Sequence, residues 1–304
     1  MSELQGKEGR GGPDVLFRQD VTEELREIRV RGVAVPTFLY GTAWKEGRTE
    51  NLVLDALAAG FRGIDTANQR RHYYEEGVGR ALDRAFRSGK SARADVFLQT
   101  KFTHRAGQDH RVPYDTRAPL AVQVEQSFES SLENLGVEQL DGYLLHGPTR
   151  RRGLGPEDVE AWRAMEALHD SGRVRLLGAS NLAADQLEEL VALARVPPAF
   201  VQNRCFARTG WDQSVREICR RRGIVYQAFS LLTANGKVLG HPSVREIAAR
   251  HGRTVPQVLF RFALALGTVP LTGTSDPGHM REDLEIYEFD LPDEEIDFLS
   301  RVLV

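Results

Sequence analysis

The chain has 304 residues, of which 41% are hydrophobic and 27% charged, and its formal net charge is −3 at pH 7. This composition allows one large hydrophobic core and is not typical of a disordered chain. A near-neutral charge argues against broad binding to nucleic acid or to a membrane surface, because both favour a strongly basic face. We therefore expect a small-molecule partner, bound by a monomer or a small homo-oligomer.

The first residues, from Met1 to about Gly12, are polar and glycine-rich, with no apolar run long enough for a signal peptide or a membrane span. We predict a flexible N-terminal tail over residues 1–20 and a single domain over residues 21–304. Cys205 and Cys219 are the two cysteines, too few for a disulfide framework or a thiolate zinc site. A reducing cytoplasm fits this pattern, and we expect no bound metal.

Strand-like and helical patterns alternate along the rest of the chain. A helix is predicted over residues 50–59, because Gly60 then provides a C-terminal cap. Apolar residues from Val124 to Leu135 recur at steps of four, four and three, which predicts a core-facing helix. Pro156 is typical of the first turn of the next helix. Strands are predicted over residues 38–40, 62–65, 96–101, 141–146, 174–178, 199–202, 224–228 and 268–271.

Eight strand–helix units in about 265 residues suit a closed parallel α/β barrel, the (β/α)8 or TIM barrel. An open dinucleotide-binding sheet would instead carry a glycine-rich turn after its first strand, and no G-x-G-x-x-G occurs there. We therefore predict a single-domain TIM barrel.

Four side chains with complementary acid and base chemistry fall at or just after the ends of three successive predicted strands. Asp65, Lys101 and His146 each end a strand, and Tyr73 lies in the connection that follows Asp65. Catalytic groups of barrel enzymes collect at these C-terminal strand ends. Taken singly, each has a structural interpretation: a strand-end Asp often caps a helix, a loop Lys is often solvated, and a lone His is often part of the core. Their joint appearance favours catalysis.

Five short motifs follow one another along these strands. They are Tyr40-Gly41-Thr42-Ala43-Trp44, Gly63-Ile64-Asp65-Thr66-Ala67, Gln99-Thr100-Lys101, Leu144-Leu145-His146-Gly147-Pro148 and Gly178-Ala179-Ser180-Asn181. With these motifs the chain resembles an aldo-keto reductase over nearly its whole length, from about Val35 to Leu299. The resemblance implies an NAD(P)H-dependent oxidoreductase that reduces an aldehyde or ketone to the alcohol, or catalyses the reverse reaction.

The resemblance also implies roles for the four side chains. Tyr73 would protonate the substrate oxygen, Lys101 would ease ionisation of the tyrosine, Asp65 would hold Lys101, and His146 would orient the substrate. The loop around Tyr73 is longer than is usual in the family, so Tyr74 competes for the role. We favour Tyr73, because acidic residues follow it by two and three positions.

Cofactor contacts are implied by the same matching of motifs. Ser180, Asn181 and Gln202 would grip the nicotinamide carboxamide, and Phe229 would stack on its ring. Phe229 could instead be plain core, and Ser180 with Asn181 could merely cap the following helix. The full implied set is Gly41, Thr42, Trp44, Asp65, Ser180, Asn181, Gln202, Phe229, Ser230, Leu271, Thr272, Gly273, Thr274, His279, Glu282 and Asp283, with the last two near adenine.

The expected 2′-phosphate site departs from the family pattern, because Leu271 and His279 occupy the positions of the usual Lys and Arg. The hydroxyls and amides of residues 272–275 could still hold a phosphate at a helix N-terminus. Without two fixed cations, discrimination between NADPH and NADH should shrink. We therefore expect either cofactor to serve, with weak preference for NADPH or none.

Two other function classes stay open at this level. One is a binding or regulatory protein that keeps the cofactor site without turnover, and the other is a barrel lyase that uses Lys101 as a Schiff base. The connection from Phe102 to Pro119 is expected to cover part of the pocket. Few residues follow the last predicted helix, which favours an open pocket for a bulkier carbonyl compound.

Overall fold

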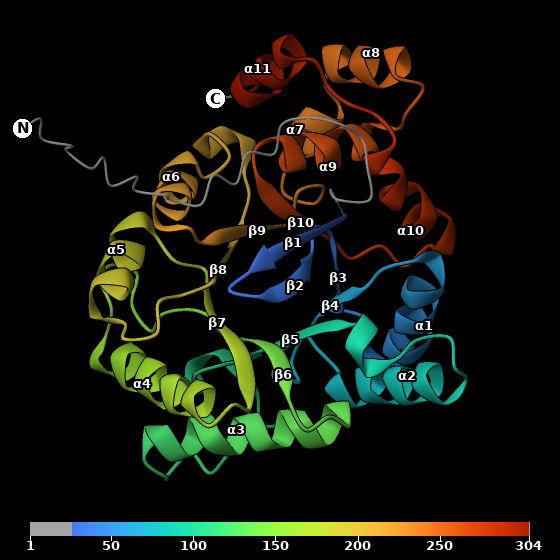
Figure 1. The fold of residues 1–304 in the computed structure, drawn as a ribbon. Coiled ribbons are helices and arrows are strands. Elements are labelled where there is room, and N and C mark those ends of the chain that lie inside the picture. The colour runs from blue at the N-terminus through green and yellow to red at the C-terminus, as the bar shows by residue number, and fades with distance from the viewer. Residues whose placement is uncertain (1–25, 304) are drawn as a thin grey trace, which may run out of the picture.

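The computed structural model describes residues 26–303, so the tail predicted over residues 1–20 lies outside the described part. Within that part, eight parallel strands close a barrel in the order β3 to β10, with β10 pairing back to β3 (Figure 1). The strands are β3 (Leu39–Gly41), β4 (Gly63–Asp65), β5 (Phe97–Phe102), β6 (Leu140–Leu145), β7 (Val174–Ser180), β8 (Phe200–Arg204), β9 (Val225–Phe229) and β10 (Thr268–Thr272). The predicted TIM barrel is confirmed.

Helices form a ring around this barrel, as Figure 1 shows along the barrel axis. The helices that follow the strands are α1 (Thr49–Ala59), α2 (Glu75–Arg87), α3 (Leu120–Leu135), α4 (Pro156–Asp170), α5 (Ala184–Leu193), α6 (Gln213–Arg222), α9 (Val255–Ala265) and α10 (Pro277–Leu284). Three further helices, α7 (Gly236–Leu239), α8 (Pro242–Arg250) and α11 (Asp293–Arg301), complete the C-terminal third. Both α8 and α11 pack on the outside of α9.

The helix boundaries follow from the sequence signals. Helix α1 ends at Gly60, whose φ of 119° lies in the left-handed region that favours glycine. Helix α3 buries the predicted apolar face from Val124 to Leu135 against the barrel. Pro156 is the first residue of α4, where its missing amide hydrogen costs nothing. The predicted helices over these segments are therefore confirmed.

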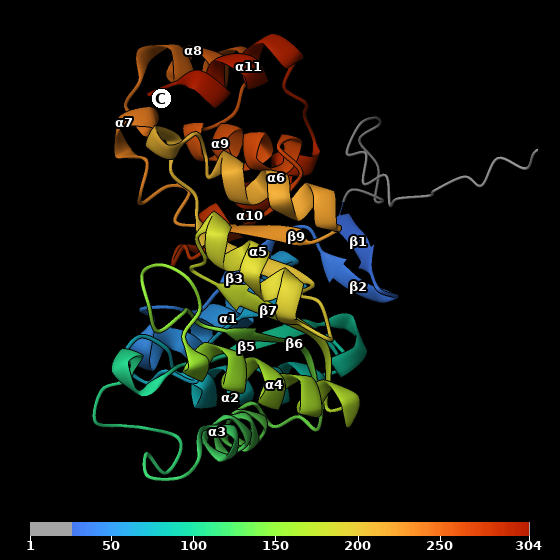
Figure 2. The same ribbon diagram turned by 90° about the vertical axis from the view of Figure 1, so that its left-hand side faces the viewer.

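An antiparallel hairpin that the sequence patterns did not predict precedes the barrel. It consists of β1 (Glu27–Val30) and β2 (Val33–Pro36), joined at Arg31 and Gly32, which both have positive φ. That pair of left-handed residues is typical of a two-residue hairpin turn. The guanidinium of Arg31 donates to the carbonyl oxygens of Pro197, at 2.6 Å, and Pro198, at 3.0 Å. The hairpin lies across one end of the barrel (Figure 2).

The hairpin closes the barrel by supplying apolar side chains to its floor. Val30, Val33 and Val35 are buried in one cluster with residues from the barrel interior, among them Phe97 and Phe200. Four-residue strands with so little contrast between their two faces give a weak sequence signal, which explains why the hairpin was missed. The open end of the barrel is therefore the opposite one, where the strands end.

Side chains alternate along each barrel strand, and this alternation separates the floor from the site. On β8, Phe200 belongs to the floor cluster, while Val201 belongs to the outer cluster beneath the helices. Gln202 and Arg204 therefore share the inward face with Phe200, at successive levels toward the open end. On β5, Phe97 and Lys101 have the same relation.

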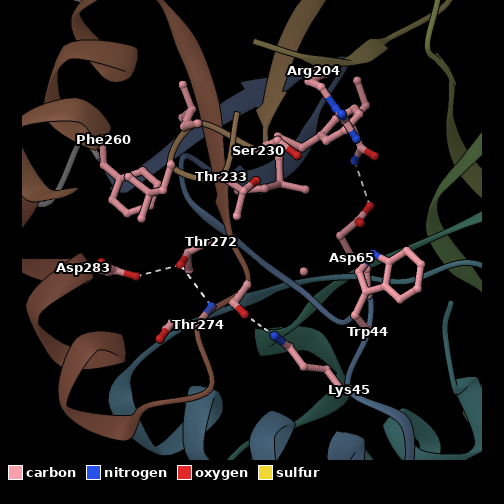
Figure 3. Close-up of a pocket in the computed structure, with 18 of the residues that line it drawn as sticks. Trp44, Lys45, Asp65, Arg204, Ser230, Thr233, Phe260, Thr272, Thr274 and Asp283 are labelled. Atoms are coloured by element: carbon pink, nitrogen blue, oxygen red, sulfur yellow. Dashed lines mark hydrogen bonds between the residues drawn. The ribbon is translucent and has the colours of Figure 1, made fainter. Parts of the chain in front are cut away.

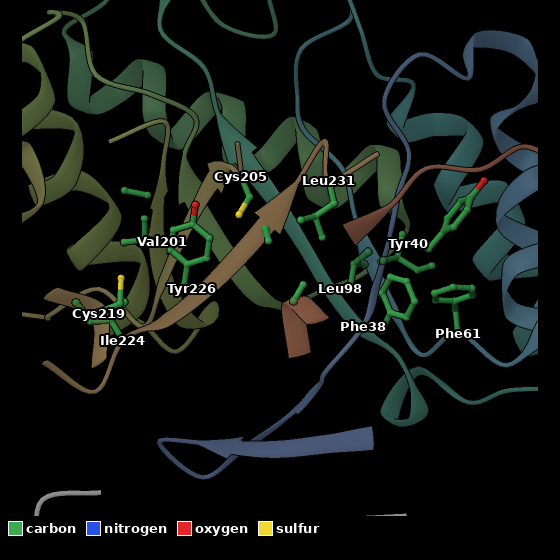
Figure 4. Close-up of a cluster of buried hydrophobic side chains, with 14 of the residues drawn as sticks. Phe38, Tyr40, Phe61, Leu98, Val201, Cys205, Cys219, Ile224, Tyr226 and Leu231 are labelled. Carbon is green, nitrogen blue, oxygen red and sulfur yellow. The ribbon is translucent and has the colours of Figure 1, made fainter. Parts of the chain in front are cut away.

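The outer cluster fills the space between barrel and helices and includes both cysteines. Figure 4 shows part of it, from Phe38, Tyr40 and Phe61 to Cys219 and Ile224. Cys205 and Cys219 are free and buried, and burial raises the pKa of both thiols to about 12. Neither can be a ready thiolate nucleophile at neutral pH.

Within residues 26–303, no helix combines the length and the apolar character needed to cross a bilayer. The same residues contain no group of three or more His, Cys, Asp or Glu side chains that could hold a metal ion.

Candidate active site

A pocket of about 1020 Å³ opens at the C-terminal ends of the barrel strands (Figure 3). This volume lies at the upper end of the range of small-molecule sites, large enough for more than one ligand group. Of the residues predicted from the sequence, only Thr42 and Lys101 do not line it. Thr42 is buried beside the pocket and donates from its hydroxyl to the carbonyl oxygen of Asp65, at 3.0 Å.

A buried ion pair joins Asp65 at the end of β4 to Lys101 on β5. Lys101 Nζ donates to both carboxylate oxygens of Asp65, at 2.7 and 2.8 Å, and to the carbonyl oxygen of Thr66 at 2.8 Å. Lys101 is fully buried and Asp65 nearly so. Burial lowers the pKa of Lys101, while the charge and hydrogen bonds of Asp65 oppose that effect. Three acceptors thus hold the ammonium in one position.

Three glutamine amides support this ion pair from within the barrel. Gln99 and Gln202 donate from Nε2 to Oδ1 of Asp65, at 2.6 and 2.8 Å. Gln227 accepts from both, and donates back to Oε1 of Gln99 at 2.9 Å. Buried polar groups of this kind are stable only when partnered. The layer fixes Asp65. Of the three glutamines only Gln202 is a predicted site residue, although Gln99 stands in the Gln99-Thr100-Lys101 motif.

Tyr73 lies in the pocket, and Tyr74 does not. The ring centroid of Tyr73 is 5.4 Å from Lys101 Nζ and 5.9 Å from the imidazole of His146. Tyr74 directly precedes α2, and its ring lies under the guanidinium groups of Arg70 and Arg80. Of the two tyrosines, Tyr73 is therefore the one beside Lys101 and His146.

The phenol of Tyr73 holds its proton firmly. Burial, with the charge of Asp65 as a second cause, raises the pKa of Tyr73 above its ordinary value. The sequence predicts that Lys101 eases ionisation of this phenol, but here Asp65 matches the charge of Lys101. The balance at Tyr73 thus favours the protonated form throughout the neutral range.

His146 is a neutral imidazole at the edge of the pocket. Burial, together with the positive charges of Lys101 and His72, lowers the pKa of His146 to about 3. Its Nδ1 is 2.6 Å from the hydroxyl oxygen of Thr103 on the neighbouring connection. If Thr103 donates to Nδ1, the ring hydrogen is on Nε2, where it can be offered to a ligand.

The depressed pKa of His146 predicts a pH-dependent contribution to stability. In the unfolded chain His146 takes up a proton below about pH 6.5, whereas in the folded protein it stays neutral down to about pH 3. The folded state is therefore favoured above pH 6.5 and loses about 1.4 kcal/mol for each pH unit below it. When the pH is lowered from 7 to 5, the free energy of unfolding measured in urea should fall by about 2 kcal/mol more in the wild type than in His146→Gln.

An exposed histidine provides the control for this measurement. His110 lies on the surface, so His110→Gln makes the same substitution away from the pocket. Equal losses in the wild type and His146→Gln would contradict a neutral imidazole at position 146.

The residues expected around the nicotinamide converge at the ends of β7, β8 and β9. Asn181 Nδ2 donates to the carbonyl oxygen of His146 at 2.8 Å, and the Ser180 hydroxyl donates to that of Gln202 at 2.6 Å. Neither residue caps α5, because its N-cap is Ala183. Asn181 and Ser230 both have left-handed φ values, 59° and 58°. Such strain is common at functional sites.

The opposite end of the pocket is formed by β10 and α10. The hydroxyl of Thr272 donates to Asp283 at 2.7 Å, and burial raises the pKa of Asp283 to about 6. The amides of Gly278 and His279, at the start of α10, donate to the carboxylate of Asp276. The helix N-terminus predicted to accept a phosphate is therefore already capped by an anion.

Two cations that the sequence analysis did not assign also line the pocket. Lys45 is buried, and its ammonium donates to the carbonyl oxygen of Gly273. Arg204, at the end of β8, is exposed. Lys45 directly follows Trp44, the last residue of the first motif, and that position was a usable signal. Other lining residues, such as Thr254 and Phe260 near α9, come close only through tertiary packing. The connection after Phe102 contributes no lining residue.

The fold and the pocket together define a barrel protein whose acidic and basic side chains lie in a pocket that has space for a large ligand. The model of the aldo/keto reductase family matches residues 40–303. Deoxymugineic acid synthase 1 of Oryza sativa subsp. japonica is 33% identical over 289 residues, which cover 87% of this chain and 85% of that protein. An aldo-keto reductase of Mycobacterium sp. (strain JLS) is 32% identical over 253 residues, with 83% of each chain covered.

Solved structures agree with these sequence relatives. The crystal structure of an aldo/keto reductase from Brucella melitensis superposes with a TM-score of 0.75 at 29% identity, covering 91% of this chain and 98% of that one. The chain belongs to the aldo/keto reductase family. Members of this family are oxidoreductases that use NADP(H) and act on small-molecule substrates.

Proposed function

We propose that this protein reduces an aldehyde or ketone to the alcohol, or catalyses the reverse reaction, by hydride transfer with NADPH or NADH. The observation that carries the proposal is the convergence of Asp65, Tyr73 and His146 on one pocket, with Lys101 held directly behind Asp65. A bound nicotinamide would supply the hydride, so the chain's own task is to bind, orient and protonate.

Tyr73 acts in this proposal as the general acid. As the carbonyl is reduced, its oxygen would take on the negative charge of an alkoxide, a far stronger base than a phenolate. The proton of Tyr73 therefore moves to that oxygen even though burial has raised the pKa of the phenol. Lys101 stabilises the phenolate that forms, and a hydrogen on Nε2 of the neutral His146 holds the substrate oxygen in place.

The pocket has side-chain oxygens that can accept hydrogen bonds from the NH2 group of a nicotinamide carboxamide. The amide nitrogens of Asn181 and Gln202 are committed to His146 and to Asp65, which leaves their oxygens to accept hydrogen bonds. Phe229, half-buried at the end of β9, offers a ring face for stacking. These features support the assignment of this end of the pocket to the nicotinamide.

We further propose that NADPH and NADH both serve. Lys45 provides one cation beside Gly273, but Leu271 and His279 replace the two usual ones, and the Asp276 carboxylate occupies the amides at the start of α10. An anion in that position weakens a phosphate site through repulsion. The ratio of kcat/KM for NADPH over NADH is therefore expected below about a thousand, which corresponds to about 4 kcal/mol.

A parallel fluorescence titration with NADPH and NADH tests the cofactor proposal before any substrate is known. Trp44 lines the pocket, and its side chain is 68% exposed. Its ring centroid lies 3.9 Å from that of His72. A bound cofactor should therefore quench the fluorescence of Trp44. Trp44→Phe is the control, because the buried Trp162 and Trp211 then report alone. Saturable quenching by both cofactors is expected, and no quenching or calorimetric response to either would contradict the proposal.

The two alternative functions receive less support. A Schiff-base lyase needs an accessible neutral amine, whereas Lys101 is fully buried and all three of its hydrogens are engaged. A binding protein without turnover would not need the acid at position 73. We also keep a reducing, cytoplasmic setting as a proposal, supported by the two free buried thiols.

A further inference from the structure

Arg204 occupies the inward face of β8 one level above the residue that contacts the ion pair. Two positions before it, Gln202 donates from its side chain to Asp65 at 2.8 Å. Residues i and i+2 of a strand point to the same side, separated by about 7 Å along it. Arg204 therefore begins directly above Asp65, and Figure 3 shows both at the same end of the pocket.

Aromatic rings hold the guanidinium of Arg204 and leave its hydrogens unused. The Arg204 guanidinium lies 5.7 Å from the ring centroids of both Phe206 and Phe229. Within residues 26–303, the guanidinium of Arg204 has no hydrogen-bonded or ion-paired partner, although its backbone belongs to the β8–β9 pairing. Rings at its faces stabilise the cation without satisfying its in-plane donors. The in-plane N–H groups of Arg204 can therefore donate to a planar anion such as a carboxylate.

The charges around the catalytic end make this cation stand out. Asp65 is the carboxylate there, and Lys101 already neutralises it. Lys45 donates to the carbonyl oxygen of Gly273, which directly follows β10 in the connection to α10. Glu282 and Asp283 line the far end of the pocket. Among the described lining residues, Arg204 is thus the cation with no polar partner, and it lies at the end where Tyr73 and His146 also lie.

We propose that Arg204 binds a carboxylate on the substrate, so that the preferred substrates are aldehydes or ketones that carry an acid group. A guanidinium pairs with a carboxylate through two parallel hydrogen bonds, which gives both affinity and orientation. Strand β8 lies two strands from β6, about 10 Å away at the backbone. The acid group should therefore be separated from the reacting carbonyl by several bonds. This inference rests on the proposed reductase function.

Matched aldehydes and a matched arginine control test the assignment. The probes are 4-carboxybenzaldehyde and 4-nitrobenzaldehyde, which have similar size and differ in charge, and the readout is kcat/KM with saturating NADPH. Arg204→Met should lower kcat/KM for the carboxylate substrate roughly tenfold to a hundredfold, and leave that for the nitro compound nearly unchanged. Arg204→Lys should recover part of the loss. Arg208→Met is the control, because Arg208 contacts the same Phe206 ring, at 5.6 Å, but does not line the pocket.

Four other outcomes would overturn the assignment. An equal loss for both aldehydes in Arg204→Met would make Arg204 a structural residue. A weaker Kd for NADPH in that variant, measured by quenching of Trp44, would assign the arginine to a cofactor phosphate instead. A wild type that reduces 4-nitrobenzaldehyde without any preference for the carboxylate overturns this inference alone, whereas no turnover with any aldehyde overturns the proposed function as well.

Discussion

Tyr73→Phe is expected to lower kcat for aldehyde reduction by about a hundredfold to ten-thousandfold, the usual contribution of a positioned general acid. The change removes one hydroxyl from a ring that faces Lys101 and His146. That hydroxyl has no hydrogen-bonded partner among residues 26–303, so its loss should leave the fold intact. The Kd for NADPH should stay close to the wild-type value, because Tyr73 supplies a proton to the substrate and does not hold the cofactor.

Tyr74→Phe is the matched control for this experiment. Among the described residues its hydroxyl is reached only by Arg80, at 3.5 Å, and its ring packs beneath Arg70 and Arg80 away from the pocket. Turnover in Tyr74→Phe should therefore be close to that of the wild type. Loss of turnover in Tyr74→Phe with activity retained in Tyr73→Phe would reverse the assignment of the acid.

Lys101→Met is expected to destabilise the folded protein by about 3–5 kcal/mol in urea unfolding, because it leaves the buried carboxylate of Asp65 without its counter-ion. Gln99 and Gln202 still donate to Asp65, which favours the lower part of this range. Activity should be lost together with stability, since the phenolate of Tyr73 would no longer be stabilised.

The double variant Asp65→Asn/Lys101→Met separates the ion pair from general damage to the core. Removing both charges leaves no uncompensated ion, so the double variant should be more stable than the sum of the single effects predicts, by about 2 kcal/mol. Strict additivity would show that the two side chains do not depend on each other for stability. Far-ultraviolet circular dichroism of each variant would establish that the barrel is still formed.

The sequence predicted the parts of this molecule that depend on local signals. The apolar runs that lead to Asp65, Lys101 and His146 are parallel strands. Parallel strands in a barrel bring their C-terminal ends together, so these three side chains lie at the same end. Gly60 and Pro156 mark helix boundaries through their own backbone preferences. For this reason the fold, and the location of the pocket within it, could be predicted from a single sequence.

Other features depend on contacts between segments that are distant in the sequence. Gln99 and Gln227 are 128 positions apart, and nothing in either strand indicates that their amides meet. The surroundings of Arg204 are also tertiary. Its guanidinium lies near the rings of Phe206 and Phe229 and has no carboxylate partner among the described residues, which its own position in the sequence does not indicate. The Asp276 cap on α10 likewise changes the meaning of the predicted phosphate segment. Which side chains contact one another depends on the tertiary fold, and the periodicity of the sequence does not predict it.

Transfer of deuterium from labelled cofactor tests the central proposal most directly. The wild type would be given 4-nitrobenzaldehyde with NADPH that carries deuterium at the transferable position of nicotinamide C4, and the alcohol analysed by mass spectrometry. Direct hydride transfer predicts one deuterium on the carbinol carbon, with the hydroxyl proton drawn from Tyr73 and ultimately from water. An alcohol without deuterium, or no alcohol at all, would contradict the reductase mechanism.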